Sequence, residues 1–285
     1  QRMGAGEAAQ AEDDRIQPSH HRTHSSQGPG ADRPRRIVPG HWPQLRPGRY
    51  SIGRLRGRGP RGKAASRAAR SSGVRPIDPA AAFEAATRIA ALGLGPEPLH
   101  LAADQGAILF RLLGPEWRPA TLDALGEEAC LSTVVATLRT IAEGPPMGKR
   151  WTVFDGIADM RERLGPEADT LPDDAWWLFD GIAAIAEALA AAGADSRPAH
   201  GDPHATNIML GPDGAVRLVD LDMACDTDPH YQLAALLNEA CQFDSEMRAG
   251  LEMWNGAWSE ALYNRCLAYA AADDLYWGLR ALLFD

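Results

Sequence analysis

Cysteine and long apolar runs are both scarce in this 285-residue chain. Its four cysteines are Cys130, Cys225, Cys241 and Cys266. None forms a Cys-x-x-Cys pair, which argues against a thiolate zinc site and favours a reduced, cytoplasmic setting. We expect no apolar run of transmembrane length, because Glu187 interrupts the stretch 183–192, and no membrane partner. The first residue is Gln1, as expected for a processed chain or a fragment, and no secretory apolar segment follows it.

Lysine and large apolar residues are nearly missing from residues 1–75. The chain has only two lysines, Lys63 and Lys149, and this segment holds seven Leu, Ile, Val or Phe against 18 Gly plus Pro. So little apolar surface does not offset the entropy cost of folding, which predicts disorder. An excess of Arg and Gly is also typical of a tail that binds nucleic acid without sequence preference, or of a GC-rich coding sequence read out of frame.

Positive charge is scarce in the rest of the chain. Residues 76–285 hold 13 Lys plus Arg against 33 Asp plus Glu, a balance of −20, whereas residues 1–75 have a balance of +11. Two parts of opposite net charge therefore meet near residue 75. The acidic part is long enough to bury a sizeable core. Its charge argues against a specific nucleic-acid partner and suits a cationic small-molecule substrate.

One motif carries most of the chemical information. Residues 200–207 read His-Gly-Asp-Pro-His-Ala-Thr-Asn, and turn residues Gly-Pro-Asp-Gly at 211–214 separate two short apolar runs. Such a hairpin brings Asn207 and Asp220 together, with Asp202 in the preceding loop. An Asp accepts a hydroxyl proton, and an Asn with an Asp offers hard oxygen ligands to Mg²⁺. A lone Gly-Asp would indicate only a loop, but the whole pattern predicts a phosphoryl-transfer site.

The motif resembles the aminoglycoside phosphotransferase and choline kinase superfamily, whose members show His-x-Asp-x4-Asn and then a hairpin that ends in Asp. The resemblance extends to Asp-Pro-His-Tyr-Gln-Leu-Ala at 228–234 and to Tyr-Trp-Gly-Leu at 276–279, which is similar to bacterial choline-kinase-like members. It covers roughly residues 76–285. Gln232 departs from the family pattern, which has Asp there.

The resemblance implies a role for each residue of the motif. Asp202 would orient the acceptor hydroxyl and accept its proton. Asn207 and Asp220 would hold Mg²⁺, and ATP would be the phosphate donor.

The resemblance also implies a first lobe that binds the nucleotide. Asp78-Pro79 predicts the start of a helix over Ala80–Leu92. Two strands are expected, at Pro98–Leu101 and Ala107–Leu113. The residues that would bind the nucleotide are Glu84, Leu109, Arg111 and Leu113. The alternatives are a solvated helix charge for Glu84 and an ordinary sheet edge for the other three.

A Gly-rich loop and a strand that carries Lys or Arg should precede this helix. Lys63 lies in Arg-Gly-Lys-Ala, which has no strand pattern, and Tyr50–Arg56 is the only faint strand candidate. The missing anchor strand motivates an alternative function, a catalytically inactive kinase-like binding protein.

Beyond Gly114 the apolar spacing predicts mainly helices. They are expected over Thr121–Glu143, Asp173–Ala192, Tyr231–Gln242, Ser245–Trp254 and Ser259–Leu283. Acidic and aromatic residues gather in this late part, and they suit an ammonium group through charge and cation–π attraction. The residues expected to contact the acceptor are Asp222, Asp228, Trp254 and Trp277. For any single one of these aromatic residues, helical spacing favours a place in the core.

The sequence thus predicts an α+β, protein-kinase-like bilobal fold with an incomplete N-lobe and a mostly helical C-lobe. Residues 1–75 would be a disordered or degraded N-lobe segment, 76–114 an N-lobe remnant and 115–285 the C-lobe. The predicted function is ATP- and Mg²⁺-dependent phosphate transfer to a hydroxyl of a small, cationic, aminoglycoside- or choline-like molecule. The identity of the acceptor and the oligomeric state are left open.

Overall fold

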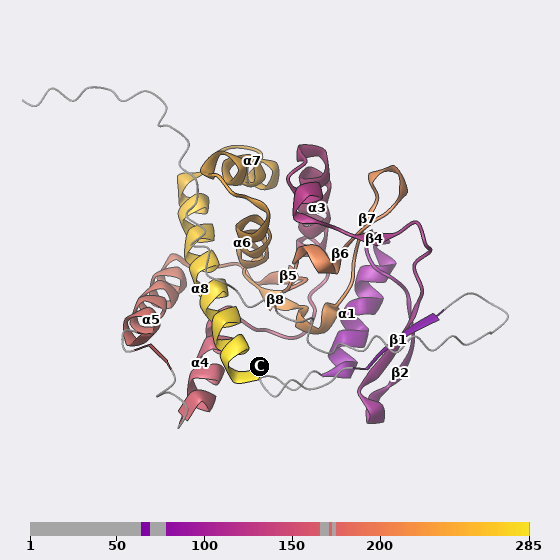
Figure 1. The fold of residues 1–285 in the computed structure, drawn as a ribbon, viewed down its shortest axis with the longest axis horizontal. Helices are drawn as coiled ribbons and strands as arrows, with labels where there is room; N and C mark the ends of the chain where they lie inside the picture. The colour runs from indigo at the N-terminus through magenta and orange to yellow at the C-terminus, as the bar shows by residue number, and fades with distance from the viewer. Residues whose placement is uncertain (1–63, 69–77, 166–170, 173–174, 285) are drawn as a thin grey trace, which may run out of the picture. The chain divides into compact units, whose positions relative to one another are not determined.

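The computed structural model describes residues 64–68, 78–165, 171–172 and 175–284, all within the second of the chain's two compact units, residues 33–285 (Figure 1). The predictions for Lys63, for Tyr50–Arg56 and for most of the basic segment therefore lie outside the described residues.

A three-stranded antiparallel sheet comes first. It consists of β1 (Ala64–Ala68), β2 (Pro98–Ala102) and β3 (Ala107–Arg111), in the order β1-β3-β2. The two predicted strands are confirmed as β2 and β3, although β3 ends two residues before Leu113.

β1 was not predicted, because Tyr50–Arg56 was the only strand candidate in residues 1–75. β1 runs antiparallel to β3, with Ala65 opposite Phe110 and Arg67 opposite Ile108. Alanine has little strand preference, and the segment shows no apolar alternation, so its sequence alone does not reveal the strand. The partner β3 supplies the missing determinant. The expected disorder of residues 1–75 is wrong for these five residues.

Helix α1 (Pro79–Ala91) begins as predicted. The carboxylate of Asp78 accepts the backbone N–H groups of Ala80 at 2.9 Å and Ala81 at 3.2 Å, which satisfies two donors at the helix start. Its buried residues are Ala82, Ala85, Ala86 and Ile89, a spacing that places them on one face. α1 packs against β2 and β3 and also contacts a short turn, η5 (Leu221–Met223).

The predicted hairpin is confirmed within a second small sheet. β6 (Ile208–Leu210) pairs antiparallel with β7 (Val216–Leu218), Ile208 opposite Leu218, and β4 (Arg118–Pro119) adds to the other edge of β6. The turn closes with a hydrogen bond from the Gly211 N–H to the Ala215 carbonyl at 2.8 Å.

A third, two-stranded sheet pairs β5 (Arg197–Ala199) with β8 (Cys225–Thr227). Residues 200–207 therefore run from the end of β5 to the start of β6. The loop that carries the predicted catalytic Asp is thus held at both ends by sheets.

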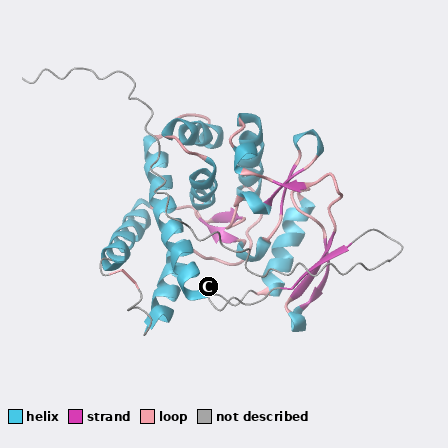
Figure 2. Cartoon of the chain, in the orientation of Figure 1, coloured by secondary structure: helices cyan, strands magenta, loops and turns pink. Residues whose placement is uncertain are grey.

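Helices make up most of the chain beyond β4, and the strands are confined to these small sheets (Figure 2). The helices are α2 (Leu122–Leu125), α3 (Glu128–Ala142), α4 (Val153–Leu164), α5 (Ala175–Ala192), α6 (Pro229–Ala240), α7 (Asp244–Asn255) and α8 (Glu260–Phe284). The helix predicted over Thr121–Glu143 is divided at Gly126 into α2 and α3. α4 was not predicted separately.

The central helix of the core is α6. Eight of its residues are buried, among them Tyr231, Leu233 and Leu236. α6 contacts α3, α7 and α8, and the long α8 runs past α4, α5 and α6 (Figure 1). The α+β class is confirmed.

Helix α5 has an unusual surface. By length and apolar composition it would suffice to cross a membrane, and it is the only such helix within the described ranges, so the expectation that no apolar run reaches that length is corrected. It nevertheless packs against α4 and α8. Trp176 and Trp177 at its start are 65% and 53% exposed.

Candidate active site

His200 anchors the predicted catalytic loop (residues 200–207). Its fully buried imidazole lies with Nε2 2.9 Å from the Val219 carbonyl, and its Nδ1 accepts the backbone N–H of Asp202 at 3.2 Å. Since Nδ1 is an acceptor, the ring proton is on Nε2, which donates to Val219. Burial lowers the pKa of His200, which keeps the ring neutral and maintains this pair of bonds.

Gln232, where the family pattern has Asp, supports the same histidine. Its Oε1 accepts the His200 backbone N–H at 3.0 Å, and its Nε2 lies 3.5 Å from the Leu138 carbonyl of α3. The side chain is fully buried. A neutral amide can both accept and donate here, so it ties the loop to α6 and α3 without burying a charge.

Gly201 occupies a position that no other residue fits well. Its φ is +82°, and a Cβ at this position would overlap the carbonyl oxygen of Met223. The chain therefore turns tightly between His200 and Asp202.

We expect Gly201→Ala to be clearly more destabilising than Gly256→Ala. Gly256 has a φ of +80° but open space around its Cβ position, so it reports backbone strain alone. The overlap at residue 201 adds a steric cost of about 1–3 kcal/mol. Urea unfolding of the two variants measures the difference, and equal losses would contradict this account.

Only one oxygen of the Asp202 carboxylate accepts a hydrogen bond. Asn207 Nδ2 donates to Asp202 Oδ2 at 3.0 Å and to the Asp202 backbone carbonyl at 2.9 Å. Oδ1 is buried and has no hydrogen-bond partner, while the side chain as a whole is 14% exposed. Burial raises the pKa of Asp202, and the charge of Asp220 raises it further, whereas His204 and His200 oppose the rise. An acceptor oxygen without a donor is what a general base needs.

Asp220 is brought to this point by the hairpin. The Val219 N–H donates to the Asn207 carbonyl at 2.9 Å, so the residue before Asp220 pairs directly with Asn207. Asp220 has a left-handed backbone, φ 68° and ψ 61°, which turns the chain into η5. A non-glycine residue in this region is strained, and such strain gathers at functional sites.

The donor set of this corner fits Mg²⁺. The amide nitrogen of Asn207 is used by Asp202, so its amide oxygen is the atom left for a cation, and Asp220 offers a carboxylate. No cluster of three or more His, Cys, Asp or Glu that could hold a metal occurs among the described residues. Mg²⁺ needs only one or two protein oxygens, because phosphate oxygens and water complete its octahedron.

His204 is a site residue that the sequence argument missed, although it lies within the motif. Its Nε2 is 3.1 Å from Asp202 Oδ1, and its Nδ1 is 3.4 Å from Glu239 Oε2 on α6. Burial would lower the pKa of His204, but the bond to Glu239 and the charges of Asp202, Glu239 and Asp273 raise it to about 9. The ring therefore carries a positive charge at neutral pH.

Asp273 of α8 is a second missed residue, and its carboxyl lies near His204 of the loop. It is 4% exposed and accepts a hydrogen bond from the Tyr231 hydroxyl at 2.8 Å. Burial raises the pKa of Asp273 to about 6, against the opposing effects of His204 and the Tyr231 bond.

We expect Asp273→Asn to stabilise the protein above pH 6. A carboxyl whose pKa is higher in the folded chain costs stability once it ionises, so the free energy of unfolding falls as pH rises from about 4 to 6. The free energy of unfolding of the variant does not fall in this pH range. The difference from the parent chain is at most about 3 kcal/mol for a shift of roughly two pKa units. Urea unfolding from pH 4 to 8 measures it, with Asp213→Asn in the exposed hairpin turn as the control. A variant less stable than the parent at pH 7 would contradict the expectation.

The predicted nucleotide-binding residues lie on α1, on β3 and just after it. Glu84 is exposed and pairs within α1 with Arg88, at 3.5 Å. Arg111 pairs with Glu97 at 2.6 Å, also at the surface, and Leu109 is half-buried. Leu113, likewise half-buried, follows the end of β3. None of them has a described contact with Asp202.

The four residues predicted to contact the phosphate acceptor have different surroundings. Trp277 of α8 lies edge-on to the His204 ring, with centroids 5.4 Å apart. Trp254 is buried in α7 and packs against His230. Asp222 is half-buried in η5, two residues after Asp220.

Asp228 belongs to a buried network of its own. It caps α6 by accepting the His230 N–H at 3.0 Å, and it accepts bonds from Arg265 Nε at 2.6 Å and the Tyr269 hydroxyl at 2.8 Å. Burial would raise the pKa of Asp228, but its hydrogen bonds and the charge of His230 lower it to about 2. These contacts give this carboxylate a structural task.

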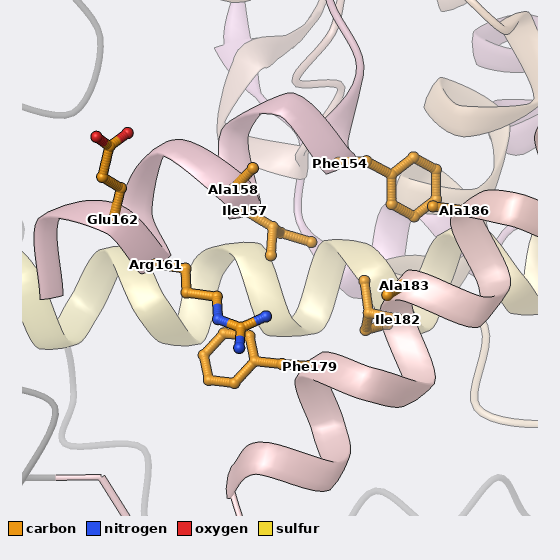
Figure 3. A pocket seen from close by; sticks show the side chains of 9 residues that line it. All are labelled: Phe154, Ile157, Ala158, Arg161, Glu162, Phe179, Ile182, Ala183 and Ala186. Carbon is orange, nitrogen blue, oxygen red and sulfur yellow. The ribbon is translucent and has the colours of Figure 1, made fainter. Parts of the chain in front are cut away.

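A separate hollow of about 500 Å³ lies between α4 and α5 (Figure 3). Its lining is mostly apolar and includes Phe154, Ile157 and Ile182, and the Arg161 guanidinium lies over the Phe179 ring at 4.8 Å. None of its residues belongs to the catalytic loop.

Comparison with known proteins places this site in context. A family model described as "Phosphotransferase enzyme family" matches residues 59–269, so the similarity includes β1 and starts before residue 76, where the resemblance was expected to begin. A comparison with curated proteins gives no match.

Solved structures show the same fold. Choline kinase LicA from Streptococcus pneumoniae is 16% identical, with 79% of this chain and 78% of that chain covered and a TM-score of 0.69. A choline/ethanolamine kinase family protein from Mesorhizobium loti is 22% identical, with 78% and 74% covered and a TM-score of 0.66. Aminoglycoside 2'-phosphotransferase-IIIa, solved with GDP, is 14% identical, with 79% and 84% covered and a TM-score of 0.56. The predicted protein-kinase-like fold is confirmed.

Proposed function

Because the chain belongs to the phosphotransferase enzyme family, we propose that it is an ATP- and Mg²⁺-dependent phosphotransferase that acts on a hydroxyl of a small, cationic molecule. The observation that carries the proposal is the state of the Asp202 carboxylate. Asn207 holds Oδ2, and the buried Oδ1 has no hydrogen-bond donor. An acceptor hydroxyl would supply that donor.

In the proposed reaction, the acceptor O–H donates to Asp202 Oδ1, and its oxygen attacks the γ-phosphorus of ATP. The new O–P bond forms as the bond from the γ-phosphorus to the bridging oxygen breaks, and ADP leaves. The hydroxyl proton passes to Oδ1. The protein's contribution is mainly position and charge, since the transition state in most accounts needs little bond formation to the acceptor.

Asn207 and Asp220 would hold the Mg²⁺. Bound there, the ion would neutralise negative charge on the phosphate oxygens. The chain's own part is to fix these two ligands at adjacent positions of the hairpin, through the Val219 to Asn207 hydrogen bond of 2.9 Å.

Nucleotide use is supported by similar structures that were solved with AMP and with GDP. For this chain we keep Leu109, Arg111 and Leu113 as the proposed adenine side, and Glu84 as the proposed partner of a phosphate-anchoring residue. Arg111 and Glu84 already have surface partners, Glu97 and Arg88, that would have to be exchanged on binding.

A cationic acceptor is supported by the charge of residues 76–285 and by the carboxyls near the loop. Asp273 and Glu239 lie close enough to raise the pKa of His204. Among the residues predicted to contact the phosphate acceptor, Trp277 lies beside His204 of the loop. Asp228, by contrast, already accepts hydrogen bonds from Arg265 and Tyr269. Choline, ethanolamine and aminoglycosides, which the names of similar structures suggest, are the first acceptors to test.

The test is a thermal shift with Mg·ATP, followed by a panel of these acceptors. We expect ATP to raise the melting temperature only when Mg²⁺ is present, and ADP to form with at least one cationic alcohol. At [ATP] of about 100 times Kd the gain is about 2.7 kcal/mol. No shift at millimolar ATP and no ADP formation would instead support the inactive binding protein.

A further inference from the structure

The imidazole of His204 lies between two carboxylates that come from different parts of the chain. Nε2 is 3.1 Å from Asp202 Oδ1 in the same loop, and Nδ1 is 3.4 Å from Glu239 Oε2 on α6. Glu239 Oε2 also accepts the Ala205 N–H at 2.7 Å, so one carboxylate fixes both the ring and the backbone that follows it. The Trp277 indole borders the ring as well, edge-on at 73°.

With the Asn207 hydrogen bond alone, the Asp202 carboxylate can still rotate about its Cβ–Cγ bond. Asn207 holds Oδ2, but the torsion about Cβ–Cγ of an Asp is broad, so Oδ1 could swing out of line with the acceptor. The His204 contact is on Oδ1 itself. It is a close charge pairing and not an aligned hydrogen bond, since Oδ1 has no hydrogen-bond partner. Such a contact restricts the carboxylate and leaves Oδ1 able to accept a proton.

We propose that His204, held by Glu239, is a positioning residue that fixes Oδ1 of Asp202 toward the acceptor hydroxyl. This inference rests on the proposed function, because Asp202 is the base of that reaction. The chain of contacts runs from α6 through Glu239 and His204 to Asp202, and it is independent of the Asn207 contact on the other oxygen.

Steady-state kinetics with the best acceptor of the panel tests the inference. We expect His204→Ala to lower kcat about 10–100-fold, the range for residues that orient a reacting group, with both KM values nearly unchanged. His204→Gln returns an N–H dipole near the Nε2 position but not the charge, so it should recover only a minor part of kcat. His100→Ala, at an exposed histidine of β2, is the control.

A double-mutant cycle tests the path through Glu239. Glu239→Gln keeps an acceptor for the Ala205 N–H but removes the charge that holds His204. If Glu239 acts through His204, this change lowers kcat in the parent chain and has little further effect in His204→Ala.

The outcomes separate the inference from the proposed function. No phosphate transfer by the parent chain to any acceptor overturns both. Full turnover by the parent and by His204→Ala overturns the inference alone. Equal kcat losses in His204→Ala and His204→Gln, with a lower melting temperature in both, show a structural role and also overturn it.

Discussion

Asp202→Asn is expected to bind Mg·ATP like the parent chain and to turn over about 10²–10⁴-fold more slowly. The amide keeps the shape of the side chain and an oxygen that can accept the Asn207 bond, so the loop should stay in place. What is lost is the ability of Oδ1 to take a proton. The effect should therefore fall on kcat and leave the KM for ATP nearly unchanged.

The measurement is ADP formation at saturating acceptor, with the Mg·ATP thermal shift recorded on the same protein. Asp213→Asn is the matched control, because Asp213 is exposed in the hairpin turn and its φ of 57° is tolerated by Asn. Near-normal turnover of Asp202→Asn would reject the role of Asp202 as base.

Asp220→Asn should weaken the response to Mg²⁺. Asn tolerates the left-handed φ of 68° at this position, so the backbone is kept while the charge on the proposed ion is removed. We expect kcat to fall about 10²-fold or more even at saturating Mg²⁺, since a fully charged ligand is lost from a site that neutralises phosphate charge.

A Mg²⁺ titration of ATP turnover measures this effect. The half-saturating concentration should rise in Asp220→Asn and stay constant in the Asp213→Asn control. An unchanged Mg²⁺ dependence together with a normal kcat would remove Asp220 from the proposed metal site.

The hairpin and the catalytic loop could be predicted because their determinants are local. Turn residues at 211–214 fix the β6–β7 connection. The spacing from Asp202 to Asn207 brings these two side chains within hydrogen-bond distance. The same holds for α1, because Asp78 as its N-cap and Pro79 as its first residue determine where the helix begins.

The features that were missed depend on partners far away in the sequence. β1 is a strand because β3 pairs with it, and five residues rich in Ala carry no sign of that partner. His204 lies within the motif, but its role depends on Glu239. Glu239 also accepts the backbone N–H of Ala205, which lies 34 positions earlier in the chain. Only the fold of α6 against the loop brings them together. By contrast, α4 has a local signal that was overlooked, the reciprocal capping of Thr152 and Asp155.

Gln232 and Glu239 hold the catalytic loop from one helix, and their separation of seven positions places them on the same face of α6. Both contacts therefore depend on the position of α6. Since α6 packs along α8, a substitution on α8 that shifts α6 would slow the proposed phosphate transfer without touching any loop residue. Because Trp277 of α8 is a proposed contact of the acceptor, a change of α8 that alters the choice of acceptor would also change the rate of the proposed reaction.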